Sequence, residues 1–414
     1  MRFEATIIGL GYIGLPTAVL IASHEKNVLG VDIDEKVIKK LSSGQSHIVE
    51  PGLNDALKKV TNNKSLEFSN KPEKSRVFVI AVPTPFKNNV DNIPEPDLVF
   101  VDNAMKSIAP YIENGDLIII ESTIPVGATE RFAKKLMQIR NDLNLDFKSS
   151  NEIDINIAHC PERVLPGNIM KEIINNDRIV GGLTKKCSKA ASAFYQKFVN
   201  GKIHETSSKI AELTKLSENS FRDVQIAFAN ELSIICDSAG IDVKELIMLA
   251  NKHPRVNILQ PGPGVGGHCI AVDPWFIASS FPDKSKLIQT ARDINNKKPS
   301  WVIGKIEKNL NEQYLKNVNR KLNVGFFGLS YKPNIDDFRE SPAIEIAKHF
   351  SGNKNFNFKT VEPNSNKKEF IKDMENITIE DSCKSIDIAI FLVKHDEFIK
   401  IDKKDYLLAL DFTG

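Results

Sequence analysis

Short apolar runs separated by stretches of helical periodicity organise the first part of the chain. The runs are Ala5–Leu10, Asn27–Val31, Val77–Val82, Leu117–Glu121 and Ile155–Ala158. Buried strands that alternate with helices in this way predict a doubly wound parallel sheet. Ligands of such a sheet bind at the carboxyl ends of its strands, so the loops after these runs are where we expect the chemistry.

A second set of apolar runs predicts another α/β unit towards the end of the chain. These runs are Leu322–Gly328, Phe358–Val361, Ile388–Val393 and Leu407–Asp411, with a helix expected at Ser341–His349 and a joining helix at Lys297–Val318. Unlike the first unit, this one lacks a glycine fingerprint, so it need not bind a dinucleotide.

One long helix is predicted in mid-chain, from about Ser207 to Asp237. Its apolar residues recur at helical spacing: Ile210, Leu213, Leu216, Val224, Phe228 and Leu232. Gly240 follows, in the position of a C′ glycine. Because the apolar residues occupy more than one side of the helix, we expect it to form a dimer interface.

The loop after the first apolar run has the spacing G-x-G-x-x-G. It is formed by Gly9, Gly11 and Gly14, with Tyr12 and Ile13 inside it. Such glycines let a pyrophosphate approach the backbone at the N-terminus of the next helix. Asp32 lies 18 residues after Gly14, where a carboxylate accepts hydrogen bonds from ribose hydroxyls and repels a 2′-phosphate. The pattern favours NAD over NADP; alternatively, Asp32 only caps the following helix.

Other strand ends carry further candidate groups. Thr84 follows the third apolar run and Thr123 follows the fourth, each beside proline. We expect both hydroxyls to face the nicotinamide half of the cofactor, or else to be helix N-caps. Glu162 and Arg163 follow the fifth run and are expected on the same rim.

Composition narrows the class of partner. The 414 residues carry a formal net charge of +2, which leaves no surplus for nucleic acid or a charged membrane. The five cysteines are scattered, odd in number and without C-x-x-C spacing, which argues against a disulfide framework and a structural metal site. The N-terminus lacks a signal-peptide pattern and no apolar stretch approaches about 20 residues, so a cytoplasmic protein is expected.

The segment Gln260–Asp273 reads QPGPGVGGHCIAVD and surrounds Cys269 with glycine and proline. Glycines let the main chain lie against a ligand where a Cβ atom would collide, and prolines limit the freedom of the loop. A thiol in such a loop is placed for chemistry. The alternative is a buried loop cysteine with no such role.

Lys215, Asn219 and Arg222 share one face of the predicted mid-chain helix. An ammonium, an amide and a guanidinium in a row suit an anionic ligand or a developing oxyanion. Alternatively this is a solvated face, on which Glu212 and Glu218 pair with Lys215.

Seven segments, in order along the chain, match motifs of a known family. They are GLGYIGLPTA (Gly9–Ala18), HIVEPGL (His47–Leu53), AVPTPFK (Ala81–Lys87), PERVLPG (Pro161–Gly167), KLSENSFRDVQIAFANELS (Lys215–Ser233), NKHPRVNILQPGPGVGGHCIAVDPWFI (Asn251–Ile277) and KPNIDDFRESPA (Lys332–Ala343). Together they resemble the UDP-glucose/GDP-mannose dehydrogenase family. The resemblance implies two Rossmann-like doubly wound domains joined by a long central helix. It also implies an NAD-binding domain at 1–204, a dimerisation and catalytic segment at 205–300 and a UDP-sugar-binding domain at 301–414.

The resemblance also implies a reaction, the four-electron oxidation of a sugar C6 alcohol to a carboxylate with two NAD⁺. The thiol of Cys269 would add to the intermediate aldehyde as a thiohemiacetal, and a second oxidation would give a thioester for water to hydrolyse. Lys215 resembles the family lysine that stabilises oxyanions, and Asn219 would help to hold that oxygen. Asp273 resembles an aspartate that positions or activates water, or it caps the next helix; Glu162 resembles a glutamate linked to thioester hydrolysis.

Several positions match family contacts to the UDP-sugar. They are Arg163, Val164, Lys215, Asn219, Arg222, His253, Arg255, Gly266, Tyr331 and Lys332. Arg255 resembles an arginine that reaches the site of a partner subunit, which implies a homodimer or a higher homo-oligomer. Arg339 resembles a residue that contacts NAD from the second α/β domain.

The versions of PERVLPG and of the cysteine segment resemble the N-acetylmannosamine branch of the family. They imply UDP-N-acetyl-D-mannosamine as substrate and a uronic acid for polysaccharide biosynthesis as product. Oxidation of UDP-N-acetylglucosamine or UDP-glucose at C6 remains an alternative, because epimers at C2 differ in the direction of one group. A nucleotide-binding scaffold, and a two-electron alcohol dehydrogenase with a structural Cys269, are further alternatives.

Overall fold

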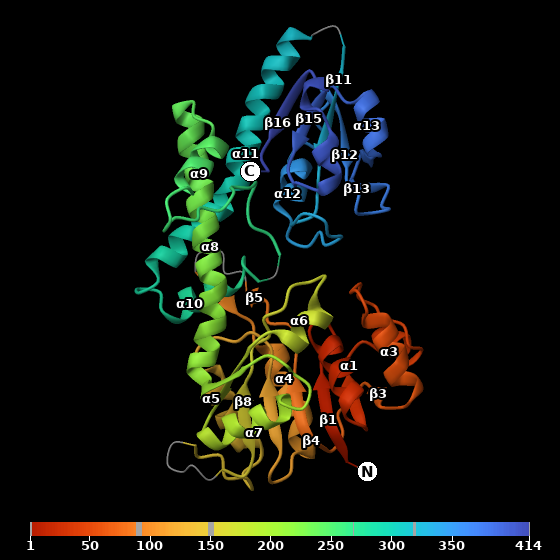
Figure 1. Cartoon of the computed structure of the whole chain (residues 1–414), viewed down its shortest axis with the longest axis vertical. Coiled ribbons are helices and arrows are strands. Elements are labelled where there is room, and N and C mark those ends of the chain that lie inside the picture. Colours follow the sequence, from red (N-terminus) through yellow and green to blue (C-terminus); the bar gives the residue numbers. More distant parts are fainter. Residues whose placement is uncertain (1, 88–92, 148–152, 268, 318–319, 414) are drawn as a thin grey trace. The chain divides into compact units, whose positions relative to one another are not determined.

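The computed structural model describes residues 2–87, 93–147, 153–267, 269–317 and 320–413. The chain divides into two compact units, the first comprising Met1–Glu218 and Trp275–Pro282 and the second Asn219–Pro274 and Asp283–Gly414. Two helices, α8 (Ser208–Ala239) and α10 (Asp273–Ser280), run from one unit into the other (Figure 1).

The first unit is built on one eight-stranded sheet. Its strands, in spatial order, are β10 (Ile203–Ser207), β9 (Arg178–Gly182), β8 (Asn156–His159), β7 (Leu117–Ile120), β4 (Ser75–Ile80), β1 (Phe3–Ile8), β2 (Val28–Val31) and β3 (Leu66–Ser69). All neighbouring strands are parallel except β8 and β9. The five predicted strands are present, which confirms the parallel core of the sheet.

Helices cover both faces of this sheet, which confirms the doubly wound architecture. One face packs against α1 (Gly14–His24), α2 (Glu35–Ser42), α3 (Leu53–Asn62), α6 (Ile169–Asn175) and α7 (Lys185–Tyr195). The other face packs against α4 (Val99–Ile108), η1 (Ala109–Tyr111) and α5 (Ala128–Ile139). A separate ribbon is formed by β5 (Phe86–Lys87) and β6 (Glu95–Pro96).

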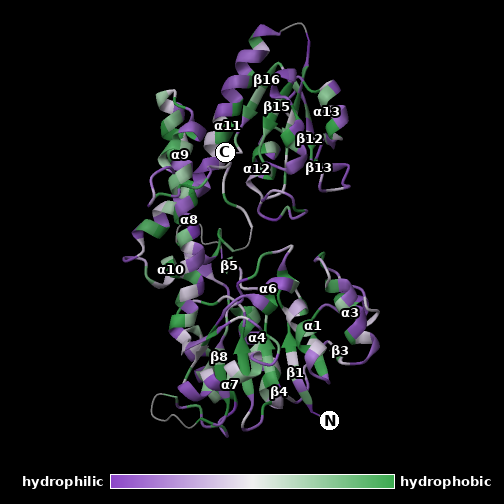
Figure 2. Cartoon of the chain, viewed as in Figure 1, coloured by the Kyte–Doolittle hydropathy of each residue, from purple (hydrophilic) through white to green (hydrophobic). Residues whose placement is uncertain are grey.

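The second unit has its own six-stranded sheet. In spatial order its strands are β13 (Glu369–Ile371), β14 (Met374–Asn376), β12 (Phe356–Val361), β11 (Leu322–Phe327), β15 (Ile388–Phe391) and β16 (Leu408–Asp411). Only β13 and β14 pair in antiparallel fashion. One face packs against α11 (Lys286–Lys316) and α12 (Pro342–His349), and the other against α13 (Ile379–Ser385), η2 (Asp396–Lys400) and residues next to η3 (Lys403–Asp405). The central strands of both sheets are largely hydrophobic (Figure 2).

Two long helices differ in how well the sequence predicted them. Helix α8 matches the expected span within two residues, and Gly240 closes it with a positive φ of 68°, as a C′ glycine does. The expectation for α11 was wrong at its start, because the helix begins at Lys286 rather than Lys297. Pro299 lies inside α11 and does not end it. The short helix α9 (Val243–Ala250) follows α8.

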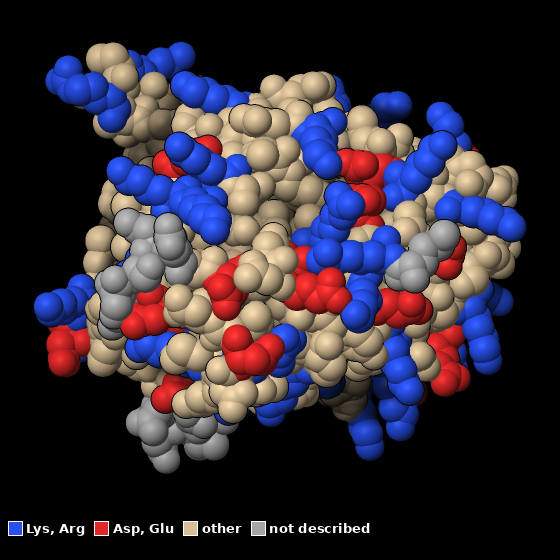
Figure 3. Space-filling model, turned by 90° about the horizontal axis from the view of Figure 1, so that it is seen from below, with Lys and Arg blue, Asp and Glu red and all other residues tan. Residues whose placement is uncertain are grey.

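Surface charge is mixed in sign. On the face shown in Figure 3, Lys and Arg side chains are interspersed with Asp and Glu rather than gathered in one field. Among the described residues, no helix combines the length and the apolar character needed to cross a membrane.

Candidate active site

The glycine turn after β1 leaves the start of α1 open to an anion. Gly9 has φ +91° and donates its N–H to the Val31 carbonyl at 2.8 Å. A Cβ added at Gly11 would meet nothing within 4 Å, so this side of the turn is open to a ligand. Helix α1 has no side-chain cap and no acidic residue in its first turn. Its N-terminal amides are therefore available to bind a pyrophosphate. The geometry of this turn fits the NAD site expected here.

Asp32 lies directly after β2 and holds this turn in place. Its two carboxylate oxygens accept hydrogen bonds from Leu10 N and Asp34 N, both at 3.0 Å. The N-cap of α2 is Asp34, which accepts a hydrogen bond from Lys36 N at 2.8 Å. The alternative that Asp32 only caps the next helix is therefore wrong.

Neither predicted threonine is a helix cap. The residues that precede α4 and α5 are Leu98 and Gly127, so Thr84 and Thr123 are half-buried loop residues at the ends of β4 and β7. A different side chain caps α5. Glu212 of α8 accepts hydrogen bonds from Gly127 N at 2.6 Å, from Thr129 N at 2.8 Å and from Thr129 Oγ1 at 2.6 Å.

The acidic residues flanking Lys215 do not pair with it. Glu212 is fully buried at α5, and Glu218 accepts a hydrogen bond from Arg163 Nη1 at 2.8 Å. The alternative of a solvated face with pairs inside α8 is therefore wrong. Within the described residues the Lys215 side chain forms no hydrogen bond or ion pair.

The ammonium group of Lys215 affects the pKa of His159, the last residue of β8. Burial lowers the pKa of His159 to about 3, and the Lys215 ammonium adds to this effect. The Nδ1 atom of His159 lies 2.8 Å from the Ile120 carbonyl, and its buried Nε2 has no partner among the described residues. His159 is thus a neutral ring under the influence of Lys215, and no sequence pattern singled it out.

The cysteine segment lies in the second unit. Cys269 is exposed, so the alternative of a buried loop cysteine is wrong. Its carbonyl accepts the N–H of Asp273 at 2.9 Å, and Asp273 is the buried first residue of α10. Asn219 Nδ2 donates to Asp273 Oδ2 at 2.5 Å. The structure therefore brings together three of the five predicted catalytic residues.

Glycines of the same loop pack tightly against neighbouring segments of the second unit. A Cβ added at Gly267, where φ is +80°, would lie 2.9 Å from the ring of Tyr331. One added at Gly264 would lie 3.0 Å from Pro299 Cγ in α11. The expectation was that these glycines let the main chain lie against a ligand. The structure shows that they let it lie against side chains of the protein itself.

Glu162 belongs to a buried ionic cluster in the first unit. Its carboxylate accepts from Arg178 Nη2 at 2.8 Å and from Arg163 N at 2.9 Å. Arg178 also lies 3.6 Å from Glu121, which accepts hydrogen bonds from Tyr195 at 2.7 Å and Thr17 at 3.2 Å. Burial raises the pKa of Glu121 to about 7, opposed by Arg178 and assisted by the charge of Glu162.

The remaining predicted substrate residues are divided between the units. Val164 packs against the core of the first unit, and the Arg163 guanidinium donates to the Asp177 carbonyl and to Glu218. In the second unit, His253 and Arg255 form an exposed turn after α9, with Arg255 N 3.3 Å from His253 Nδ1. Arg222 is exposed on α8, and Arg339 bonds Asp337 at 2.9 Å.

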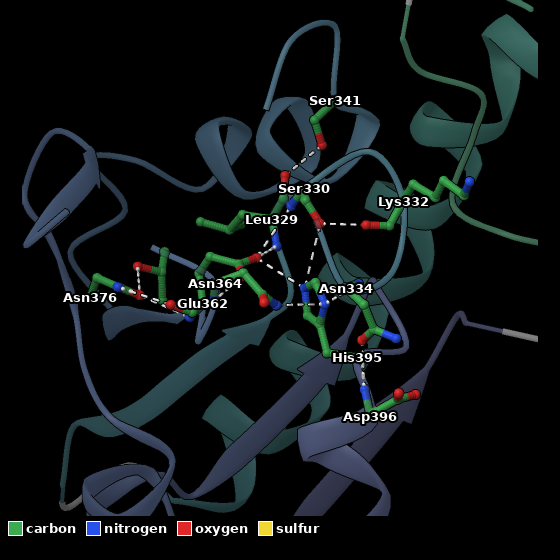
Figure 4. Close-up of polar contacts among 11 residues, drawn as sticks. Leu329, Ser330, Lys332, Asn334, Ser341, Glu362, Asn364, Asn376, His395 and Asp396 are labelled. Carbon is green, nitrogen blue, oxygen red and sulfur yellow. Dashed lines mark hydrogen bonds and ion pairs between the residues drawn. The ribbon is translucent and has the colours of Figure 1, made fainter. Parts of the chain in front are cut away.

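The loop after β11 repeats the construction of the first nucleotide turn. Gly328 N donates to the Val361 carbonyl at 3.0 Å, and Leu329 N donates to Glu362 at 2.7 Å. His395 Nδ1 accepts from Asn334 N at 3.0 Å, so its Nε2 carries the hydrogen and donates to Glu362 at 3.1 Å (Figure 4). The Lys332 side chain extends away from this cluster (Figure 4).

Family models match most of the chain. The descriptions are the NAD binding domain, the central domain and the UDP binding domain of the UDP-glucose/GDP-mannose dehydrogenase family, at residues 3–199, 209–297 and 325–410. The chain belongs to the UDP-glucose/GDP-mannose dehydrogenase family. The expected resemblance, the NAD cofactor and the class of enzyme are thereby confirmed.

Individual relatives span nearly the whole chain. A UDP-N-acetyl-D-mannosamine dehydrogenase of Yersinia pestis is 48% identical and covers 98% of this chain and 97% of its own length. An NDP-N-acetyl-D-galactosaminuronic acid dehydrogenase of Ralstonia nicotianae is 46% identical, with 96% and 92% covered.

Solved structures of the family are similar throughout. The UDP-N-acetyl-mannosamine dehydrogenase Cap5O of Staphylococcus aureus has a TM-score of 0.83 at 40% identity and covers 99% of this chain and 94% of its own. A UDP-D-ManNAc dehydrogenase of Pyrococcus horikoshii has a TM-score of 0.85 at 36% identity, with 100% and 96% covered. These neighbours confirm the fold of two Rossmann-like domains.

Besides His159, four structural features had no sequence signal of their own. Arg178 lies in none of the recognised motifs, and Glu121 was noted only as the end of a predicted strand. Glu212 was considered only in the alternative of a solvated face, as a partner of Lys215. The pair Glu362 and His395 is separated by 33 residues, so only the fold brings it together.

Proposed function

We propose that this chain is an NAD-dependent UDP-N-acetyl-D-mannosamine 6-dehydrogenase that converts the C6 alcohol of the sugar to a carboxylate. The observation that carries the proposal is an exposed Cys269 linked through its own carbonyl to a hydrogen-bonded pair of Asn219 and Asp273. A two-electron alcohol dehydrogenase or a scaffold has no need of that arrangement. The choice of sugar is supported by relatives of that name at 48% identity.

We assign the cofactor to the first glycine turn and the strand ends beside it. The proposed contacts are Gly9, Gly11, Tyr12, Ile13, Gly14, Asp32, Thr84, Thr123 and, from the second unit, Arg339. Bound there, NAD⁺ would supply the hydride acceptor for both oxidations, from the C6 alcohol to the aldehyde and from the thiohemiacetal to the thioester. The half-exposed carboxylate of Asp32 retains acceptor capacity for ribose hydroxyls beyond its two backbone hydrogen bonds.

In the proposed reaction, the thiolate of Cys269 adds to C6 of the aldehyde and forms a thiohemiacetal. Loss of hydride from that carbon gives a thioester, and attack by water releases the uronic acid and the thiolate. Lys215, which has no ionic partner among the described residues, and Asn219 stabilise the oxyanions. Asp273 orients or activates the attacking water. Glu162, whose carboxylate is held by Arg178, supports hydrolysis by fixing the loop that carries Arg163 and Val164.

The UDP-sugar contacts and the assembly are part of the same proposal. The proposed contacts are Arg163, Val164, Lys215, Asn219, Arg222, His253, Arg255, Gly266, Tyr331 and Lys332. A homodimer is supported by Phe221, Phe228 and Ile235, which recur every seven residues on α8 and are 65%, 53% and 56% exposed. We propose a cytoplasmic enzyme whose product enters polysaccharide biosynthesis.

The test is the stoichiometry and the sugar preference of the pure protein. We expect two NADH per UDP-N-acetylmannosamine consumed, measured by absorbance. A ratio of one would support a two-electron enzyme, and no NADH with any UDP-sugar would support a scaffold. Cys269→Ser is expected to abolish the complete reaction while NAD still binds. Full turnover by that variant would remove the covalent intermediate from the mechanism.

A second substrate is favoured by one observation. The relative named for N-acetyl-D-galactosaminuronic acid is almost as similar as those named for mannosamine. UDP-N-acetylgalactosamine therefore belongs in the assay beside UDP-N-acetylmannosamine, UDP-N-acetylglucosamine and UDP-glucose. A higher kcat/KM with UDP-N-acetylgalactosamine, UDP-N-acetylglucosamine or UDP-glucose than with UDP-N-acetylmannosamine would replace the proposed sugar and leave the mechanism standing.

A further inference from the structure

Helices α8 and α11 share a buried polar chain inside the second unit. Arg292 Nη1 donates to Asp223 Oδ1 at 2.6 Å, and Asn295 Nδ2 donates to the same oxygen at 2.8 Å. Asn295 Oδ1 in turn accepts from Asn230 Nδ2 at 2.9 Å. All four side chains are at most 2% exposed. Burying these polar side chains costs desolvation energy, so packing of the two helices does not by itself explain why they are there.

The chain of hydrogen bonds ends on the cysteine loop. Asn230 Oδ1 accepts the backbone N–H of Gly262 at 2.9 Å. Gly262 N–H can only donate and the Asp223 carboxylate can only accept, so the two ends fix the orientation of both amides between them. The three bonds from Gly262 to Asn230, from Asn230 to Asn295 and from Asn295 to Asp223 all run in one direction and polarise one another, while Arg292 Nε and Asp223 Oδ2 have no partner among the described residues.

The contact at Gly262 differs from the others that hold the loop. Gly264 is packed against Pro299, and Gly267 against Tyr331, so van der Waals contact fixes the loop there. At Gly262 a Cβ would meet only the Gly264 carbonyl oxygen at 3.9 Å. The hydrogen bond from Gly262 N to Asn230 Oδ1 ties this part of the backbone to α8, beside the buried ring of Pro261.

We propose that Asn230 is a positioning residue for Cys269: it anchors the loop through Gly262 and so sets where the thiol is presented. The proposal rests on the proposed function for its kinetic consequence. Asn230 touches neither thiol nor substrate in this assignment and acts through seven residues of loop. Misplacement of a reacting group by about 1 Å can cost about 100-fold in rate, so removal of this anchor is expected to lower kcat about 10- to 100-fold.

The variant Asn230→Ala tests the anchor, and Ser233→Ala is its matched control. Ser233 lies one turn further along α8 and accepts a hydrogen bond from Lys298 of α11 at 2.5 Å, but makes no bond to the loop. We expect Asn230→Ala to lower kcat while KM for UDP-sugar and NAD changes less than about threefold, and Ser233→Ala to keep kcat within about threefold. Equal losses of kcat in both variants would overturn the proposal.

Amide hydrogen exchange gives a readout that does not depend on the reaction. Pro261 and Pro263 have no N–H, so Gly262 carries the single exchangeable amide between Gln260 and Gly264. Its exchange is expected to be at least about tenfold faster in Asn230→Ala than in the wild type, and unchanged in Ser233→Ala. Equal exchange in wild type and Asn230→Ala would overturn the anchor. Absence of turnover by the wild type would count against the proposed function and leave this result readable.

A second pair of variants covers the case in which Asn230→Ala does not fold. Gly262→Pro removes the donor itself from a partly exposed loop position, and Gly262→Ala retains it where space is open. We expect Gly262→Pro to lower kcat about 10- to 100-fold and Gly262→Ala to keep it within about threefold. A Gly262→Pro enzyme with wild-type kcat would overturn the proposal.

Discussion

Removing the carboxylate of Glu212 is expected to destabilise the first unit and to loosen its cofactor loop. Glu212 is fully buried on α8 and caps the N-terminus of α5, far away in sequence. The loop that α5 follows contains Thr123, one of the proposed NAD contacts. The change Glu212→Ala therefore tests whether α8 fixes that loop.

The magnitude follows from the three hydrogen bonds that end on this carboxylate. Two come from backbone amides, Gly127 N and Thr129 N, and one from Thr129 Oγ1. A hydrogen bond to a charged group contributes about 1.5–3 kcal/mol, and the hydroxyl can rotate to another acceptor. The two amides alone give a loss of about 3–6 kcal/mol in the free energy of unfolding. Glu212→Gln keeps one acceptor oxygen and is expected to lose about 1–2 kcal/mol.

The assay is urea unfolding followed by tryptophan fluorescence in a Trp301→Phe background. The chain has two tryptophans, and the remaining Trp275 belongs to the first unit. NAD affinity is measured in parallel by calorimetry and is expected to fall with stability. The control is Glu130→Ala in the first turn of the same helix, whose partly exposed pair with Lys209 is worth at most about 1 kcal/mol. A loss in Glu212→Ala no larger than in Glu130→Ala would refute the capping argument.

Three further predictions address other parts of the molecule. Because burial raises the pKa of Glu121 to about 7, the folded state keeps a proton that the unfolded chain releases, so stability falls as pH rises from about 4.5 to 7. Because Glu121→Gln does not titrate, its free energy of unfolding relative to wild type should rise by on the order of 3 kcal/mol between pH 4.5 and pH 7. Urea unfolding at several pH values measures this difference, and an equal pH dependence of stability in the two proteins would contradict the prediction. In the second unit, Glu362→Ala removes the acceptor of four hydrogen bonds and should cost about 3–6 kcal/mol, against about 1–3 for Glu362→Gln, both followed through Trp301 in a Trp275→Phe background. Phe228→Glu should convert the proposed dimer to a monomer in light scattering, and an unchanged mass would exclude this face of α8 as the interface.

The sequence predicted those parts of the fold that have a local signal. Strands β1, β2, β4, β7 and β8, the glycine turn and α8 each show their own periodicity or spacing over a few residues. Strands β9 and β10 were missed because RIVGG carries two glycines and IHETS is largely polar, so neither forms an apolar run. Their presence also makes the sheet mixed, since β9 runs antiparallel to β8.

Residues that function through distant partners could not be predicted in the same way. Glu212 was grouped with Lys215 because both lie on α8, yet its partners are 83 and 85 residues away. Helical spacing says which residues share a face and does not say what covers that face. Arg178 could not be predicted for the same reason. Its carboxylate partners, Glu162 and Glu121, follow two different strands, β8 and β7.

The two α/β units share the same turn after their first strand, in which an acidic residue that follows the second strand accepts a backbone N–H. The two units differ in whether that acidic residue can still bind a ligand. Asp32 and Glu362 both accept the N–H of the residue that follows a positive-φ glycine, Leu10 in one unit and Leu329 in the other. A carboxylate has about four acceptor sites. Asp32 is half-exposed and receives two backbone hydrogen bonds, so it can still accept from ribose hydroxyls. Glu362 is buried and receives four, one of them from the imidazole of His395. Its acceptor sites are filled, which accounts physically for a second unit that keeps the nucleotide-binding framework without the dinucleotide fingerprint.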